Sequence, residues 1–207
     1  MSTKVKICGI TRLEDARAVV AAGADALGLM FVRSSPRVVS IARARELAQA
    51  VGTDIARVGV FADPTAAEVE RVLAEVELDI LQFHGDEPQS FCERWNLPYI
   101  KAARVRSAVD GAGLRAAHPG ACAWLLDAYQ PGQLGGTGER FDLNYWPSDA
   151  PVKLVLAGGL DPTNVAAAIV SARPFAVDVS SGVEGAHKGE KCAAKIAEFV
   201  TAVREAG

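Results

Sequence analysis

Two side chains in the sequence, Cys8 and Asp127, stand at the ends of short apolar runs and could act together as an acid–base pair. Cys8 ends the run VKIC, and Asp127 follows AWLL. A carboxyl group that emerges from a buried run must be hydrogen-bonded or exchange its proton. A thiolate is a capable base where donors or positive charge lower its pKa, although a cysteine is as readily a small buried hydrophobic residue. Such a pair suits a proton-transfer enzyme.

Small residues collect in two later segments, LAGGL and VDVSSGVE. Gly158 and Gly159 follow the first apolar run, and Ser180, Ser181 and Gly182 follow the second. Turns of this kind expose backbone N–H groups without obstructing side chains, which is typical of a phosphate-binding site. The alternative is a pair of tight turns that need glycine only for their backbone conformation. We interpret the five residues as a phosphate site.

Further charged residues stand near the ends of other apolar runs. The segment VRSSPRVVS carries Arg33 and Arg37, and a guanidinium beside a phosphate pocket is expected to meet a second anion such as a carboxylate. A surface arginine is usually only solvated. Lys101 would be a Schiff-base nucleophile if it were desolvated. His84 and Asp178 complete the polar residues that we expect at the strand ends.

The elements that must position these residues are eight short apolar runs, about 20 to 30 residues apart, the spacing of parallel strands joined by crossover helices. Amphipathic helical patterns alternate with them, which predicts an α/β fold, a closed (β/α)8 TIM barrel formed by residues 1–207 as a single domain. The rival is an open doubly wound sheet, but no GxGxxG follows the first run. The predicted strands are 5–8, 26–31, 57–61, 79–84, 99–103, 123–128, 153–158 and 176–181.

Capping signals indicate where several of the helices begin and end. Thr11 fits the N-cap of a capping box, and Gly23 fits the stop of the same helix. Either Asp63 or Thr65 begins a second helix beside a proline. The last helix is predicted at about 191–205, with one apolar face.

Composition and charge exclude several classes of protein. The chain has 207 residues, of which 50% are hydrophobic, which is enough for a sizeable core. A net charge of −3 gives no sign of a nucleic-acid or anionic membrane partner. We find no signal-peptide pattern and no run long enough to span a bilayer. Scattered cysteines without a CxxC pair or a Cys/His cluster predict neither a zinc site nor a disulfide framework, and favour a reducing cytoplasm.

The segment DAYQPGQLGGTGERFD, at 127–142, is rich in glycine and longer than a strand-to-helix turn requires. Beside a catalytic acid, such a segment is expected to act as a lid that closes over substrate. Disorder without a function is the alternative.

With these residues in place, the chain resembles the phosphoribosylanthranilate isomerase family, (β/α)8 enzymes of tryptophan biosynthesis. The matches run in order from one end of the chain to the other. They are KICGIT (6–11), GADALGLMF (23–31), SPR (35–37), RVGVF (57–61), LQFHGDE (81–87), LLDAYQPGQLGGTGERFD (125–142), LVLAGGLDPTNV (154–165) and RPFAVDVSSGVE (173–184).

The resemblance implies an Amadori rearrangement of N-(5′-phosphoribosyl)anthranilate, a small phosphorylated substrate, with no metal or organic cofactor. It implies that Cys8 is the general base and Asp127 the general acid. Arg37 would meet the anthranilate carboxylate, and His84 and Asp178 would support the pocket. The phosphate would lie against the glycines and serines described above.

One departure and several alternatives stay open. Family members often carry a Lys-Asp pair before the last helix, where this chain has Lys191-Cys192 (191–192). Another sugar-phosphate barrel enzyme would be a Schiff-base aldolase on Lys101, or an aminoaldose isomerase of histidine biosynthesis, which is expected to have an aspartate where this chain has Cys8. A non-catalytic phosphate-binding barrel would bind without turnover. The oligomeric state, monomer or homodimer, does not follow from the sequence.

Overall fold

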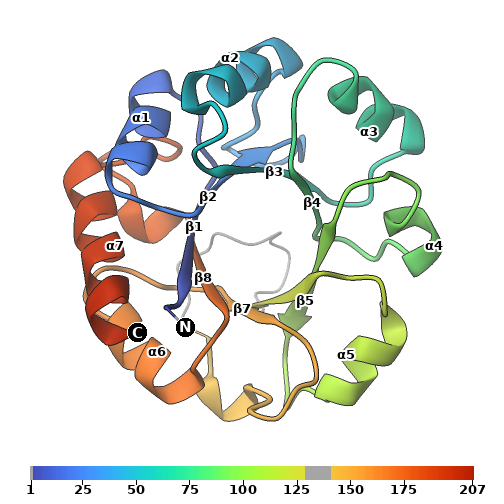
Figure 1. Cartoon of the computed structure of the whole chain (residues 1–207), viewed down its shortest axis with the longest axis vertical. Helices are drawn as coiled ribbons and strands as arrows, with labels where there is room; N and C mark the ends of the chain where they lie inside the picture. Colours follow the sequence, from blue (N-terminus) through green and yellow to red (C-terminus); the bar gives the residue numbers. More distant parts are fainter. Residues whose placement is uncertain (1, 129–140) are drawn as a thin grey trace.

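The chain folds into a closed barrel of eight parallel strands, in the order of the sequence, with β1 paired to both β2 and β8. The computed structural model describes residues 2–128 and 141–207. Figure 1 looks down the barrel and shows the helices arranged as an outer ring around the strands. The predicted (β/α)8 barrel is confirmed.

All eight predicted runs form strands, with small differences at their ends. The last two stop earlier than predicted, because Gly158 and Gly159 take left-handed φ angles of +90° and +61° and Ser181 begins a 3-10 turn. The strands are β1 (Lys4–Cys8), β2 (Ala26–Met30), β3 (Ala56–Phe61), β4 (Ile80–Phe83), β5 (Tyr99–Val105), β6 (Ala123–Ala128), β7 (Leu154–Leu156) and β8 (Ala176–Val179).

The helices follow the strands on the outside of the barrel (Figure 1). Within the described residues they are α1 (Leu13–Ala21), α2 (Ile41–Val51), α3 (Ala66–Leu73), α4 (Gln89–Cys92), α5 (Gly111–Ala117), α6 (Val165–Ala172) and α7 (Ala193–Ala206). Short 3-10 turns lie at η1 (Leu143–Tyr145) and η2 (Ser181–Val183).

The predicted caps were right at one helix and wrong at another. Thr65 caps α3 in a capping box with Glu68, as its spacing predicts. Thr11 does not cap α1, whose N-cap is Arg12. Thr11 instead donates its hydroxyl hydrogen to the Gly189 carbonyl, 2.7 Å away. The predicted stop holds, since Gly23 follows the C-cap of α1 with φ of +75°.

Strand residues alternate between two apolar layers, and this alternation decides which side chains reach the barrel interior. The inner layer holds small and branched side chains such as Ala102, Leu125 and Val155. The outer layer, between the strands and the helices, holds larger ones such as Phe83 and Phe199. Inward-facing residues at the carboxyl ends of the strands therefore line one mouth of the barrel.

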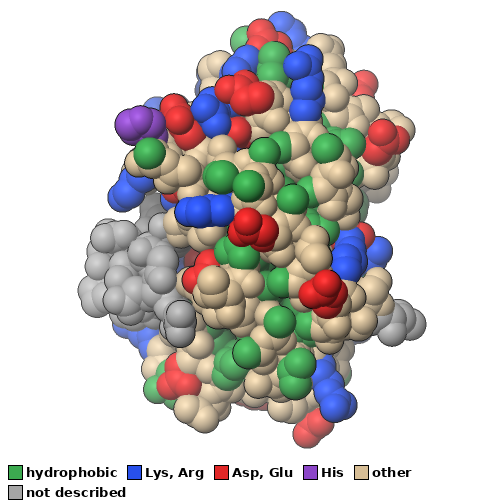
Figure 2. Space-filling view, turned by 90° about the vertical axis from the view of Figure 1, so that its left-hand side faces the viewer, with side chains coloured by type: hydrophobic (Ala, Val, Ile, Leu, Met, Phe, Trp, Pro, Cys, Tyr) green, Lys and Arg blue, Asp and Glu red, His purple; other side chains and the backbone are tan. Residues whose placement is uncertain are grey.

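Figure 2 shows the face made by α1, α6 and α7, on which side chains of both charges are interspersed with hydrophobic ones. Among the described residues, no helix is long and apolar enough to cross a membrane.

Candidate active site

Cys8 lies at the carboxyl end of β1, on the inner face of the barrel. It is 5% exposed and packs with Val58 and Val60 of β3. Its neighbour across the β1–β2 pair is Gly28, and a side chain there would leave no room, because a Cβ would lie 2.8 Å from the Cys8 Sγ. Burial raises the pKa of the Cys8 thiol, and the positive charge of Lys6 opposes that effect.

Asp127 lies near the carboxyl end of β6, two residues after the inner-layer Leu125, and is 6% exposed. Its Oδ2 is 3.5 Å from Nε2 of His84, which directly follows β4. The other ring nitrogen of His84 lies 3.3 Å from the Gln82 amide nitrogen. Within the described residues, His84 Nε2 and Gln82 Oε1 are buried without a hydrogen-bond partner. Buried polar atoms of this kind are usually satisfied, so both are suited to receive a ligand.

Asp178 of β8 lies on the inner wall between Cys8 of β1 and Asp127 of β6. Its Oδ1 lies 2.9 Å from Nζ of Lys6, two residues before Cys8 on β1, and the Asp178 and Lys6 side chains are 10% and 5% exposed. The pKa of Asp178 is raised, because it is buried and because the Asp127 charge adds to the effect, although Lys6 and His84 oppose it. The inner wall at this end thus carries two pairs of titratable side chains, His84 with Asp127 and Asp178 with Lys6, and the Cys8 thiol.

The two predicted phosphate loops meet each other after β7 and β8. Gly182 in η2 packs so closely on the Leu160 carbonyl oxygen that a Cβ would overlap it. The Gly159 carbonyl accepts a hydrogen bond of 2.8 Å from the Asn164 side chain. Ser181 opens the 3-10 turn η2. Backbone groups and small side chains therefore form this part of the rim, which suits an anion.

Ser180 joins the phosphate loops to β1. Its hydroxyl donates to the Cys8 carbonyl at 3.0 Å. The ammonium of Lys191 donates to the Ser180 carbonyl at 2.9 Å and lies 3.2 Å from its hydroxyl oxygen. The loop that departs from the family pattern thus places a buried cation directly behind the serine.

Arg37, in the loop after β2, is buried and already paired. Its Nε and Nη2 donate to the two carboxylate oxygens of Glu184 at 2.6 and 3.0 Å. Lys191 contacts the same carboxylate at 3.2 Å. Burial alone would raise the pKa of Glu184, but these two cations hold it below its usual value. The contacts with Glu184 use Nε and Nη2 and not Nη1, so we expect a second anion to approach on the Nη1 side.

Lys101 does not lie where the aldolase alternative requires. It pairs in register with the outward-facing Phe83 and Trp124 and therefore points away from the barrel interior. Its Nζ contacts the carbonyls of Phe83 and Gly85 and lies 2.9 Å from Glu87 Oε2. A substrate in the barrel mouth cannot reach it, and the Schiff-base interpretation is wrong.

Several residues of the site were not identified from the sequence. Lys6 and Gln82 each precede a recognised residue by two positions, so strand alternation was an available signal for both. Glu184 gave no such signal, because its partner Arg37 lies 147 residues away in the chain. Lys191 contacts Ser180 and Glu184, 11 and 7 residues away, from a loop that the strand pattern does not cover.

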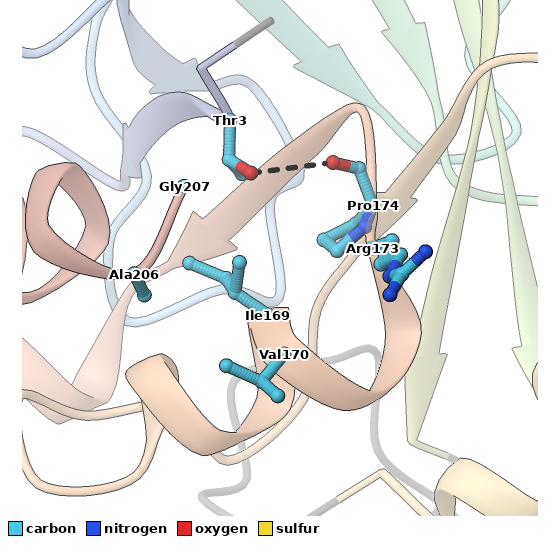
Figure 3. Close-up of a pocket in the computed structure, with 7 residues that line it drawn as sticks. All are labelled: Thr3, Ile169, Val170, Arg173, Pro174, Ala206 and Gly207. Carbon is cyan, nitrogen blue, oxygen red and sulfur yellow. Dashed lines mark hydrogen bonds between the residues drawn. The ribbon is translucent and has the colours of Figure 1, made fainter.

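Other features of the chain do not contribute to this site. A pocket of about 350 Å³ lies between α6 and the end of α7, beside the residues that precede β1 and β8, which is the opposite end of the barrel (Figure 3). Among the described residues, no group of three or more His, Cys, Asp or Glu side chains is arranged to hold a metal ion. The predicted lid, at 127–142, lies mostly outside the described residues, which omit 129–140.

Comparison with known proteins is consistent along the whole chain. Residues 5–202 match the family model described as N-(5'phosphoribosyl)anthranilate (PRA) isomerase. An N-(5'-phosphoribosyl)anthranilate isomerase of Pseudomonas aeruginosa (strain LESB58) is 51% identical over 98% of this chain and 96% of the relative.

Two solved structures give the same result. Phosphoribosyl anthranilate isomerase from Thermotoga maritima has a TM-score of 0.87 at 38% identity, covering 98% of this chain and 99% of that one. A second structure of such an isomerase, in complex with reduced 1-(o-carboxyphenylamino)-1-deoxyribulose 5-phosphate, has a TM-score of 0.84 at 37% identity, with the same coverage.

Proposed function

The chain belongs to the N-(5′-phosphoribosyl)anthranilate isomerase family, and on this basis we propose a mechanism in which Cys8 is the general base and Asp127 the general acid. It is an isomerase of tryptophan biosynthesis that acts on a small phosphorylated substrate. The proposed reaction converts N-(5′-phosphoribosyl)anthranilate into 1-(2-carboxyphenylamino)-1-deoxyribulose 5-phosphate by an Amadori rearrangement.

The rearrangement needs two proton transfers at neighbouring atoms of the sugar. Asp127 gives a proton to the ribose ring oxygen, and the ring opens as the anilino nitrogen forms an iminium with C1′. The Cys8 thiolate then removes the proton from C2′, and the electron pair moves into the iminium to give an enolamine. Tautomerisation to the ketone completes the reaction. The iminium is the electron sink.

The observation that carries the proposal is the set of buried groups on the inner wall between the two residues. Asp127 and Cys8 face inward near the carboxyl ends of their strands, at the same mouth of the barrel. Asp178 and Lys6 lie between them on the inner wall. His84, 3.5 Å from Asp127, has a ring nitrogen with no hydrogen-bond partner among the described residues, and this atom is suited to hydrogen-bond the sugar. A proton donor and a proton acceptor can thus face one substrate.

The substrate has two anionic ends, and two parts of the rim suit an anion. One part offers backbone groups and the other offers a guanidinium. We assign the phosphate to Gly158, Gly159, Ser180, Ser181 and Gly182, whose loops meet after β7 and β8. We assign the anthranilate carboxylate to the Nη1 side of Arg37, whose other two guanidinium nitrogens bind Glu184. His84 and Asp178 shape the pocket between them.

The test is the turnover of Cys8→Ala and Asp127→Asn, followed by the fluorescence of phosphoribosylanthranilate. General acid–base groups typically contribute about 10² to 10⁴-fold, so kcat should fall by at least that much in each variant. Cys122→Ala and Asp54→Asn, which replace exposed residues of the same types, are the matched controls and should keep wild-type kcat. A loss below about tenfold would remove the substituted residue from its role.

Three further expectations stay predictions. They are that residues 1–207 act as one domain, that the protein is cytoplasmic, and that it is a monomer or a homodimer.

A further inference from the structure

Lys6 is a buried cation that the mechanism above does not use. It lies two residues before Cys8 on β1, so both side chains point into the barrel. Lys6 is 4% exposed, and a lysine is almost never buried to this extent without a partner. The Lys6 ammonium therefore occupies the inner wall directly below the thiol.

The barrel register fixes the Lys6 ammonium in place. Lys6 is the cross-strand neighbour of Asp178, and their Nζ and Oδ1 atoms lie 2.9 Å apart. On the other side, Cys8 faces Gly28, where a Cβ would lie 2.8 Å from the Cys8 Sγ and 3.2 Å from the Lys6 Nζ. The absence of a side chain at Gly28 therefore leaves one shared space in which the thiol and the ammonium are neighbours.

We propose that Lys6 is a positioning residue that holds a permanent positive charge beside Cys8 and thereby stabilises the thiolate that acts as the base. This inference rests on the proposed function of Cys8. Lys6 keeps its proton throughout the reaction, and the thiolate alone accepts the proton from C2′. Asp178 acts by holding the ammonium in this position.

Electrostatics supports this role. Burial disfavours a thiolate, and the charged groups that act on Cys8 are Lys6, Asp178 and Lys191. Lys6 gives the largest effect that opposes burial, and Asp178 acts in the opposite direction. Burial would lower the pKa of Lys6, but Asp178 and the Cys8 thiolate raise it above its usual value, which favours the charged ammonium.

The test measures the titration of the Cys8 thiol in Lys6→Met. The thiolate is followed by its ultraviolet absorbance, taken as the difference between each protein and its Cys8→Ala counterpart. A neighbouring opposite charge typically shifts a pKa by roughly 1 to 3 units, so the pKa of Cys8 should rise by at least one unit. The pH at which kcat/KM reaches its plateau should rise equally, and kcat/KM near neutral pH should fall about tenfold per unit.

Two variants separate charge from structure. Lys6→Arg keeps the charge and should restore the thiol titration towards that of the wild type. Lys4→Met removes a lysine from the same strand that is exposed and paired with Asp25, and should change neither readout. If Lys6→Met does not fold because Asp178 loses its partner, Lys6→Met/Asp178→Asn replaces it. Its thiol pKa should still exceed that of the wild type, because Lys6 acts on the thiol more strongly than Asp178 does.

The outcomes distinguish this inference from the proposed function. An unchanged thiol titration in folded Lys6→Met would overturn the role of Lys6, even if Cys8→Ala is inactive. Full activity in Cys8→Ala would overturn the proposed function, whatever the titration shows. A shifted thiol pKa together with a matching shift of the pH profile supports both.

Discussion

Two buried lysines in this barrel have almost the same surroundings and different uses. Lys6 and Lys101 are 4% exposed, and each lies 2.9 Å from a carboxylate that is at most 10% exposed, Asp178 and Glu87 respectively. Lys6 lies on the inner face of β1, and Lys101 lies on the outer face of β5. The comparison teaches that the face of the strand, and not the residue type, decides whether a buried charge can take part in chemistry.

The two pairs also differ in what they leave unsatisfied. Lys101 contacts two carbonyls as well as Glu87, and Glu87 accepts hydrogen bonds from the backbone of Asp63 and Gly85. The outer pair thus ties together the loops after β3 and β4, and its charged atoms contact each other and nearby backbone groups. The inner pair instead adjoins Cys8 and the ionisable groups of the barrel mouth. We therefore expect the outer pair to support stability and the inner pair to support catalysis.

The largest effect on stability is expected from Lys101→Met. Removing one partner of a buried ion pair typically costs about 3 to 5 kcal/mol, because the other charge stays buried and unpaired. The kcat of the folded fraction should remain at the wild-type value. Denaturant unfolding and active-site-normalised kinetics measure the two quantities.

An exposed pair provides the control for this variant. Arg45 and Glu75 lie 3.3 Å apart with both side chains about half exposed, so Arg45→Met should cost about 1 kcal/mol or less. A Lys101→Met protein that unfolds normally but turns over slowly would contradict the division between the two faces.

A smaller effect, on binding, is expected from Arg37→Met. A hydrogen bond to a charged group contributes about 1.5 to 3 kcal/mol, which corresponds to a rise in KM of roughly 10 to 100-fold with kcat nearly unchanged. Glu184 would keep Lys191 and the Gly189 backbone as partners, so the fold should survive. Steady-state kinetics gives both constants.

Arg33→Met is the matched control, since Arg33 lies in the same loop with its side chain 82% exposed and paired to Glu68. If Arg33→Met raises KM and Arg37→Met does not, the carboxylate site has been assigned to the wrong arginine.

The smallest effect is expected at the opposite end of the barrel. Val170 on α6 is 67% exposed and lines the pocket of Figure 3. Surface substitutions away from special features usually change stability by less than about 0.5 kcal/mol. Val170→Ser should therefore leave both the unfolding free energy and kcat/KM as they are, and a marked loss of activity would show that this end of the barrel is coupled to the site.

Local sequence patterns were sufficient to predict the barrel. Eight apolar runs at regular spacing determine strand number and order, and the capping box at Thr65 depends on residues three positions apart. The prediction for Thr11 failed because a contact far away in the chain, with Gly189, took its hydroxyl. Local sequence patterns thus predict a helix cap correctly unless a tertiary contact uses the same side chain.

The site was predictable only in part, for the same reason. Strand ends identify Cys8 and Asp127, and alternation along β1 would have added Lys6. Lys101 points outward because of its register with the neighbouring strands. This register cannot be predicted from the local sequence. Glu184 lies 147 residues from Arg37, and no pattern in the chain links them.

The most direct test of the account is a crystal structure of the protein with reduced 1-(o-carboxyphenylamino)-1-deoxyribulose 5-phosphate. We predict the phosphate on the backbone of Gly159 and Ser181 and the carboxylate on Arg37, each at a hydrogen-bonding distance of about 3 Å. We predict that the sugar lies between Cys8 and Asp127 and contacts both side chains. An analogue bound so that other side chains separate the sugar from either Cys8 or Asp127 would contradict the proposed acid–base pair.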